Sequence, residues 1–237
     1  MTKRLSLIAL LFISLFSGCK DDMSAYECDA CTNNPEANPA YDNTGQGIYK
    51  GVLIGSSGNI KVNMANDGTT ISAVIVIDGA SVTLTGNGTY STSSGFQGSF
   101  TGSFNGGTII IPFSVSNIGV VSVGSPTIPG HSNVIFSVLK ERSTQLVEAY
   151  EGTFRGADSG TFNMLILRDN QGNGVWYAIA RSDADFYLQG DIMSNDLTGG
   201  GGELLVTGEI GGDNVSGAWQ NTSVEAVSGT WKGKRTL

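Results

Sequence analysis

The chain has few charged residues and a single histidine, and both shortages exclude functions. Only 14% of its 237 residues are Asp, Glu, Lys or Arg, and the net charge is −8. Its 13 basic residues form no footprint for nucleic acid and no polybasic patch for anionic lipid, so no nucleic-acid partner is expected. The one histidine, His131, lies in a turn-like context, whereas a serine or cysteine hydrolase needs a base beside its nucleophile. We therefore expect no such hydrolase.

Motifs of nucleotide and hydrolase chemistry are also absent. There is no Walker loop, no dinucleotide fingerprint and no Gly-x-Ser-x-Gly elbow, and the glycines of residues 198–203 precede a strand rather than open a helix. No catalytic residue is assigned, no cofactor is expected, and the chain is predicted not to be an enzyme. A polysaccharide-acting enzyme stays as an alternative, because the two carboxylates that it needs are brought together only in space.

The apolar run near the start of the chain is too short to span a bilayer as a helix, which takes roughly 20 residues. This run, residues 5–16, follows a basic pair at residues 3–4 and ends at the small residues Ser17 and Gly18. A basic start, a short apolar stretch and small residues at the end are the layout of a secretory signal peptide. We predict that residues 1–18 are such a signal.

Ser17-Gly18-Cys19 resembles the lipobox of bacterial lipoproteins, and Lys20-Asp21-Asp22 resembles the signal that sends Bacteroidota lipoproteins to the cell surface. The resemblance implies that Cys19 becomes the mature N-terminus and carries fatty acyl chains such as palmitate. It implies attachment to outer-membrane lipid, with the protein facing the cell exterior; two or more acyl chains hold a protein stably. An ordinary cleaved signal with an incidental cysteine, followed by a solvated charge cluster, is the alternative.

Two further cysteines, Cys28 and Cys31, form a Cys-x-x-Cys pair. In an exported protein an even remainder favours a disulfide. A redox centre would accompany a βαβ pattern, which is absent, and structural zinc needs four ligands. We expect a small structural disulfide, with a free or partner-linked pair as the alternative. The polar, Asn- and Pro-containing residues 19–46 around it predict a flexible tether.

From Gly47 onward the chain predicts an all-β fold. Nearly every segment of about six to ten residues is β-branched or aromatic and is bounded by turn residues, and no long amphipathic helix is indicated. Tyr49 and its neighbours recur around Tyr150, so we predict two repeats, residues 47–140 and 141–237. Short turns without crossover helices indicate tandem antiparallel meanders that form two small barrels or one joined barrel. This is similar in kind to the calycin architecture of lipocalins and avidins.

Residues 96–104 alternate so that three phenylalanines and two glycines share one face of a strand. A face of large rings beside glycines suits the curved interior of a small barrel. We predict that this face is core, and an exposed aromatic binding platform is the alternative.

Candidate binding residues lie in the second repeat. Four aromatic residues could stack on a ligand such as a sugar ring, or could instead be core: Trp176, Tyr177, Tyr187 and Trp219. No metal site is expected, although the acidic group Asp183, Asp185 and Asp191 is a weak candidate for calcium.

These features predict a lipid-anchored surface protein that acts as a non-enzymatic binding or interaction module for a glycan or a protein. One alternative is a carrier of a small apolar ligand inside a barrel, and another is the polysaccharide-acting enzyme. Fold analogy does not choose among them.

Overall fold

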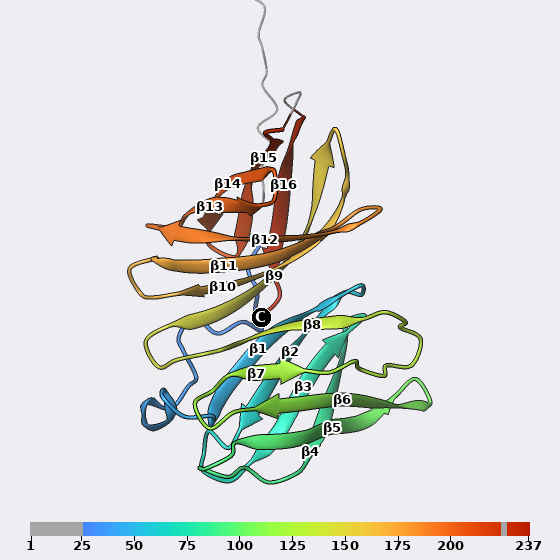
Figure 1. The fold of residues 1–237 in the computed structure, drawn as a ribbon, viewed down its shortest axis with the longest axis vertical. Helices are drawn as coiled ribbons and strands as arrows, with labels where there is room; N and C mark the ends of the chain where they lie inside the picture. The colour runs from blue at the N-terminus through green and yellow to red at the C-terminus, as the bar shows by residue number, and fades with distance from the viewer. Residues whose placement is uncertain (1–25, 224–226) are drawn as a thin grey trace, which may run out of the picture.

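The computed structural model describes residues 26–223 and 227–237, and these form an all-β protein of 16 strands and one 3-10 turn, Pro39–Tyr41. The strands make two antiparallel sheets of eight (Figure 1), which confirms the prediction of tandem meanders and shows two units rather than one joined barrel. No helix in the described part of the chain is long and apolar enough to cross a membrane. The predicted signal and the lipobox-like stretch that ends at Cys19 lie outside the described residues.

The first sheet is an up-and-down meander in the order β7-β6-β5-β4-β3-β2-β1-β8. Its first strand pairs with its last as well as its second, so the sheet curls round until only β7 and β8 lack a shared ladder. We call this nearly closed unit the first barrel. Its strands are β1 (Gly47–Ile54), β2 (Gly58–Met64), β3 (Ile71–Ile77), β4 (Ala80–Asn87), β5 (Phe96–Phe104), β6 (Gly107–Val115), β7 (Val121–Val123) and β8 (Ile135–Lys140).

The second sheet is a closed barrel, because its first strand pairs with both its second and its last. Every strand is antiparallel to its neighbours, so all backbone edges are paired and none is left free. We call this unit the second barrel. Its strands are β9 (Leu146–Gly156), β10 (Gly160–Arg168), β11 (Gly174–Arg181), β12 (Asp185–Met193), β13 (Asp196–Gly201), β14 (Leu204–Gly211), β15 (Asn214–Asn221) and β16 (Ser228–Arg235).

Strand β5 shows how the sequence fills the first barrel. Phe96, Phe100 and Phe104 are buried, and the rings of Phe96 and Phe100 stack with centroids 6.0 Å apart. A β-carbon on the intervening Gly98 would lie 2.8 Å from the ring of Phe96, so the glycine leaves the space that the ring needs. The prediction that this face is core is confirmed.

The two barrels meet where β1 lies against β9 and β10. A small apolar cluster of Val52, Val147 and Leu165 fills the contact, and beside it Lys50 Nζ lies 2.6 Å from Glu141 Oε2. Both side chains of this ion pair are almost fully buried. A buried charge that loses its partner costs about 3 to 5 kcal/mol, so this pair ties the linker between the barrels to β1.

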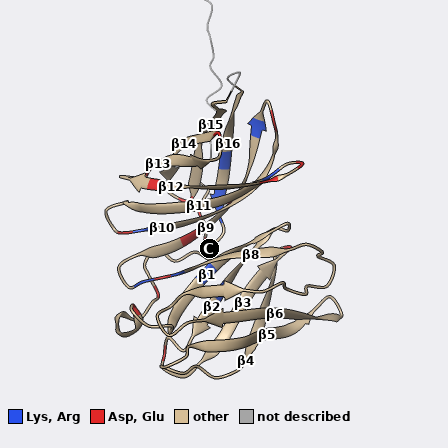
Figure 2. Ribbon diagram, viewed as in Figure 1, with Lys and Arg blue, Asp and Glu red and all other residues tan. Residues whose placement is uncertain are grey.

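Charged residues are sparse in the first barrel. No Asp, Glu, Lys or Arg occurs between Asp78 and Lys140, and Figure 2 accordingly shows β4, β5 and β6 free of charged residues. The first barrel therefore presents a largely neutral surface over these strands.

Residues 26–46, predicted as part of a flexible tether, instead lie against both barrels, and we call them the strap. Glu36 N donates to Glu141 Oε1 at 2.6 Å, at the linker between the barrels. At the base of the second barrel, Arg235 Nη1 donates to Asn33 Oδ1 at 2.9 Å. The polar composition that predicts a tether also supplies these hydrogen bonds, and no apolar periodicity signals them.

A disulfide joins Cys28 and Cys31 in the strap. The backbone N–H of Cys28 donates to Asp213 Oδ2 at 2.8 Å, in the turn between β14 and β15. The disulfide loop is thereby fixed to the lower end of the second barrel, next to Arg235, whose Nη1 lies 3.2 Å from Asp213 Oδ1.

Candidate functional site

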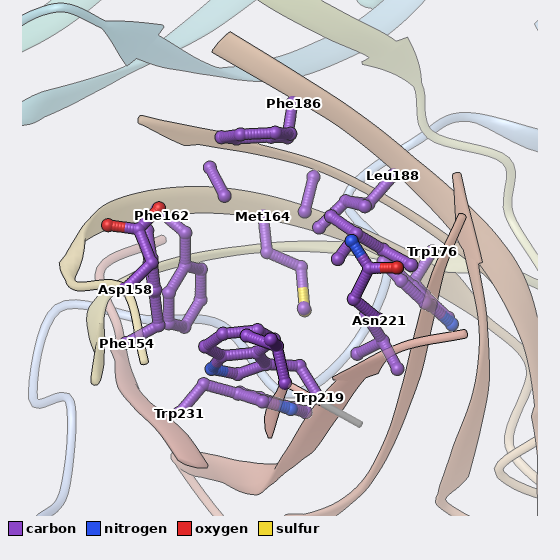
Figure 3. Close-up of a pocket in the computed structure, with 15 residues that line it drawn as sticks. Phe154, Asp158, Phe162, Met164, Trp176, Phe186, Leu188, Trp219, Asn221 and Trp231 are labelled. Atoms are coloured by element: carbon purple, nitrogen blue, oxygen red, sulfur yellow. The ribbon is translucent and has the colours of Figure 1, made fainter. Parts of the chain in front are cut away.

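The second barrel contains a cavity of about 180 Å³ near one end. That end carries the β9–β10, β11–β12 and β15–β16 connections and is opposite the end that meets the strap. Figure 3 shows the side chains that surround the space. They are mostly apolar and come from seven strands and their connections: Phe154, Asp158, Phe162, Met164, Trp176, Ala178, Ala180, Phe186, Leu188, Leu204, Val206, Trp219, Asn221, Val227 and Trp231.

Small side chains on β11 leave this space open. Phe162 of β10 faces Ala180 across the ladder, whereas the corresponding pair in the first barrel is Ile60 and Ile75, both buried. An isoleucine at the position of Ala180 would extend into the interior, and alanine does not. The second repeat therefore keeps the barrel scaffold of the first but omits interior volume at this end.

Two indoles form fixed walls of the cavity. Trp176 Nε1 donates to Thr198 O at 3.2 Å, and Trp231 Nε1 donates to Thr207 O at the same distance. Trp231 lies over Gly208, where a β-carbon would come within 2.3 Å of its ring. Glycine on the neighbouring strand thus gives the large ring room to lie flat against the backbone, which holds the wall in one position.

Trp219 is the exception among the three indoles. Its Nε1 is buried and has no hydrogen-bond partner among the described residues. Its ring packs edge to face against Phe154, with centroids 6.3 Å apart, and it lies on the same side of the cavity as Trp231 (Figure 3). Leaving a buried donor unsatisfied costs about 1 to 3 kcal/mol. Trp219 Nε1 lies over the backbone of Gly229, where a β-carbon would come within 2.5 Å of it, so it faces the barrel wall rather than the open space.

The mouth of the cavity is more polar and more exposed than its floor. Phe186 and Val227 are 36% and 39% exposed at the rim, and Asp158 and Asn221 add a carboxylate and an amide. Asp158 Oδ2 accepts from Ser182 Oγ at 2.9 Å, which ties two rim loops together. Asp158 is the one ionisable side chain among the described residues of this lining.

The structure separates the four predicted binding residues into two pairs. Trp176 and Trp219 line the cavity, whereas Tyr177 and Tyr187 point out of the barrel and are 39% and 66% exposed. Successive residues of a strand face opposite sides of the sheet, so Trp176 and Tyr177 could not share a site. The two tyrosines instead line an outer groove of about 470 Å³, together with Asn163.

Sequence reasoning missed several cavity residues, including Phe162, Met164 and Ala180. Phe162 and Met164 alternate along β10 as core residues do, so only their place beside Ala180 distinguishes them from ordinary core. An alanine opposite a phenylalanine, at a position where the first repeat has isoleucine, is the signal that could have identified them.

The weak calcium candidate is not assembled. Asp185 Oδ1 accepts from Arg181 Nε at 2.6 Å, and this guanidinium holds the pKa of the Asp185 carboxyl below its usual value. Asp191 lies six residues further along the same strand, which corresponds to about 20 Å. No group of three metal-ligating side chains occurs among the described residues. The structure therefore does not bring Asp183, Asp185 and Asp191 together at one point.

Comparison with known proteins adds no relative: the chain matches no protein-family model, no curated protein and no solved structure. The cavity and the groove are thus interpreted from their own chemistry.

Proposed function

We propose that the second barrel binds a small, largely apolar molecule in its cavity. The observation that carries this proposal is the apolar space of about 180 Å³ that opens at one end of a closed barrel and is walled by indoles. An engineered apolar cavity of about 150 Å³ takes up benzene. The space in the second barrel therefore suits a single ring or a short branched chain rather than a long fatty acid.

The size and the apolar lining of the cavity set the affinity that we expect. A ligand of about ten non-hydrogen atoms, at roughly −0.5 kcal/mol per atom, would bind with a Kd of about 0.2 mM. We expect a weak, rapidly exchanging site.

The proposal is tested with acetophenone and ethylbenzene, which differ mainly in the carbonyl acceptor. At ten times its Kd a ligand stabilises the fold by about 1.4 kcal/mol, which a thermal melt detects. Ethylbenzene should bind at least as tightly as acetophenone, because the floor of the cavity is apolar, and Ala180→Leu, which fills the space, should weaken both.

The control is Tyr177→Phe, on the outer face of the barrel, which should change neither affinity. If neither compound shifts the melt of the unaltered chain at millimolar concentration, the cavity does not bind single-ring compounds and the proposal fails.

A second candidate function is glycan binding in the outer groove. Tyr177 and Tyr187 are exposed on neighbouring strands, with the amides of Asn163 and Gln189 beside them. Aromatic faces can stack on sugar rings while amides bond their hydroxyls, as in other sites that combine apolar area with a few polar groups. Calorimetry with a panel of oligosaccharides tests this, and Tyr187→Ala should abolish any heat that the unaltered chain gives.

We further propose that the barrels are displayed at the cell surface by acylated Cys19. Support comes from the lipobox-like Ser17-Gly18-Cys19 and the following Lys20-Asp21-Asp22. Intact-mass measurement of the protein from bacterial membranes tests the proposal. A chain that begins at Cys19 with added acyl mass is expected, and an unmodified cysteine would contradict it.

A further inference from the structure

A serine and an aspartate flank the single histidine of the chain. Ser56 Oγ lies 2.9 Å from His131 Nδ1, and Asp78 Oδ2 lies 3.2 Å from His131 Nε2. Ser56 is in the β1–β2 turn, Asp78 in the β3–β4 turn, and His131 in the long connection before β8. In the sequence, Ser56 and Asp78 are 75 and 53 positions away from His131, so sequence reasoning does not place a base beside a nucleophile. The three residues become neighbours because their turns and connection meet at one end of the first barrel.

From this geometry we propose that Ser56, His131 and Asp78 form a hydrolytic site for carboxylic esters, separate from the cavity of the second barrel. Ser56 is the nucleophile, His131 its base, and Asp78 the group that orients the base. A nucleophile bonded to a base, which is in turn oriented by a third group, is the arrangement that activates a serine hydroxyl.

The hydrogen bonds fix the tautomer that this role requires. With Nε2–H donating to the Asp78 carboxylate, Nδ1 carries a free lone pair toward the Ser56 hydroxyl. The His131 side chain is only 14% exposed and its ring centroid lies 6.2 Å from that of Phe104, so the imidazole is held in place. The carboxylate then stabilises the imidazolium that forms when the proton is taken up.

Ser56 is accessible from a groove of about 340 Å³ between the two barrels. Across the groove is Arg181, whose guanidinium lies so close to Gly55 that a β-carbon there would be 2.5 Å from Nη1. Asp185 fixes this guanidinium by two hydrogen bonds, of 2.6 and 2.9 Å. A fixed positive charge in the same groove, against the residue that precedes the nucleophile, is suited to stabilise an oxyanion.

The neighbouring serine is engaged differently. Ser57 Oγ donates to Glu151 Oε2 at 2.8 Å, and Glu151 Oε1 accepts from the backbone N–H of Gly58 at 2.6 Å. Ser57 therefore bonds a carboxylate that also accepts a backbone hydrogen bond, whereas Ser56 bonds the imidazole. This difference makes Ser57 a matched control.

The reaction consumes only the ester and one water molecule. Ser56 Oγ attacks the ester carbonyl carbon, its proton passes to His131 Nδ1, and the carbonyl π pair moves onto the oxygen that faces Arg181. Collapse breaks the C–O bond of the ester, and the alcohol leaves with the proton from Nδ1. Water repeats the sequence on the acyl-serine and releases the acid.

The exposure of Asp78 indicates esters rather than amides as substrates. Its side chain is 57% exposed, so water screens its charge and it stabilises the imidazolium less than a buried carboxylate would. An alcohol leaves with less protonation than the amine of an amide, so a weaker acid–base pair suffices. The Tyr177 and Tyr187 groove, which shares Asn163 with the groove at Ser56, can accept a ring in such a substrate.

The test uses the full chain in detergent, a fluorophosphonate probe with peptide mapping, and 4-nitrophenyl acetate hydrolysis. We expect phosphonylation at Ser56, no labelling there in Ser56→Ala, and labelling and hydrolysis within twofold of the unaltered chain in Ser57→Ala. His131→Gln should slow both readouts by about 10² or more, the usual contribution of a positioned base.

Variants are compared only where the melting temperature shows that they are folded. If His131→Gln does not fold, Ser56→Cys provides a second readout, because a thiol beside the imidazole should react with iodoacetamide at neutral pH at least tenfold faster than the thiol of Ser57→Cys. Folded protein that is not labelled at Ser56, labelling unchanged in His131→Gln, or equal thiol reactivity at the two positions would each overturn the proposal and leave the three residues as a clamp between turns.

Discussion

Filling the cavity with Ala180→Leu should stabilise the second barrel and abolish ligand binding together. Ala180 lines the cavity on β11, so the three added carbon atoms enter existing space. A methyl-sized group takes up about as much volume as a water molecule, about 30 Å³, so the three would occupy roughly 90 Å³, about half of the space. At about 24 cal/mol per Å³ of cavity removed this corresponds to about 2 kcal/mol, from which about 0.5 to 1 kcal/mol of side-chain entropy is subtracted.

We therefore expect a net gain of about 1 to 1.5 kcal/mol in the free energy of unfolding. Urea titration followed by tryptophan fluorescence measures it, and a second titration with acetophenone should show at least a tenfold loss of affinity. The matched control, Tyr177→Phe, changes an outward-facing residue of the same strand and should leave both quantities within 0.5 kcal/mol. A loss of 1 kcal/mol or more in Ala180→Leu would refute the reasoning, because overpacking of that size means that the space is already filled.

Three further outcomes follow from the fold. Gly208→Ala should destabilise by about 1 to 3 kcal/mol in urea, because its β-carbon would meet the Trp231 ring at 2.3 Å. Lys50→Ala should lower the free energy of unfolding by about 3 to 5 kcal/mol in the same assay, because it leaves Glu141 charged and buried without its partner. A smaller loss in the double variant Lys50→Ala with Glu141→Gln would confirm that the unpaired charge is the cause. Partial burial acts to raise the pKa of the Asp42 carboxyl, but hydrogen bonds from Ser143 in the linker outweigh it and lower the pKa overall. The contribution of this carboxylate to the free energy of unfolding should therefore be complete above about pH 4 and be lost as the pH falls through the lowered pKa. Melting curves of Asp42→Asn should accordingly differ from those of the unaltered chain at pH 7 and converge with them near pH 2.

The sequence predicts the strands better than it predicts what they enclose. Alternation in residues 96–104 and the recurrence of Tyr49 at Tyr150 are local signals, and the structure bears out the two meanders that they indicate. Whether an inward face encloses a cavity depends on its cross-strand partners. Ala180 reads as an ordinary small core residue until the register places it opposite Phe162.

The packing of the strap and the cluster around His131 were beyond sequence reasoning for the same reason. Asn33 bonds Arg235 across 202 positions, and no periodicity encodes such a pair. Ser56 meets His131 only because the meander brings a turn and a long connection to the same end of the first barrel. Alternation along a strand predicts which side chains face the core, whereas the closure of the sheets decides which distant residues become neighbours.

The most direct test of the central claim, that the second barrel binds a ligand inside, uses methyl NMR of the methionines. Met164 lines the cavity, Met64 is buried in the first barrel, and Met193 is 71% exposed on the second. With methyl-labelled methionine and increasing acetophenone, we predict a saturable ring-current shift of the Met164 methyl and no comparable shift of the other two. A Met164 signal that stays fixed, or that moves no more than the Met193 signal, would contradict the account.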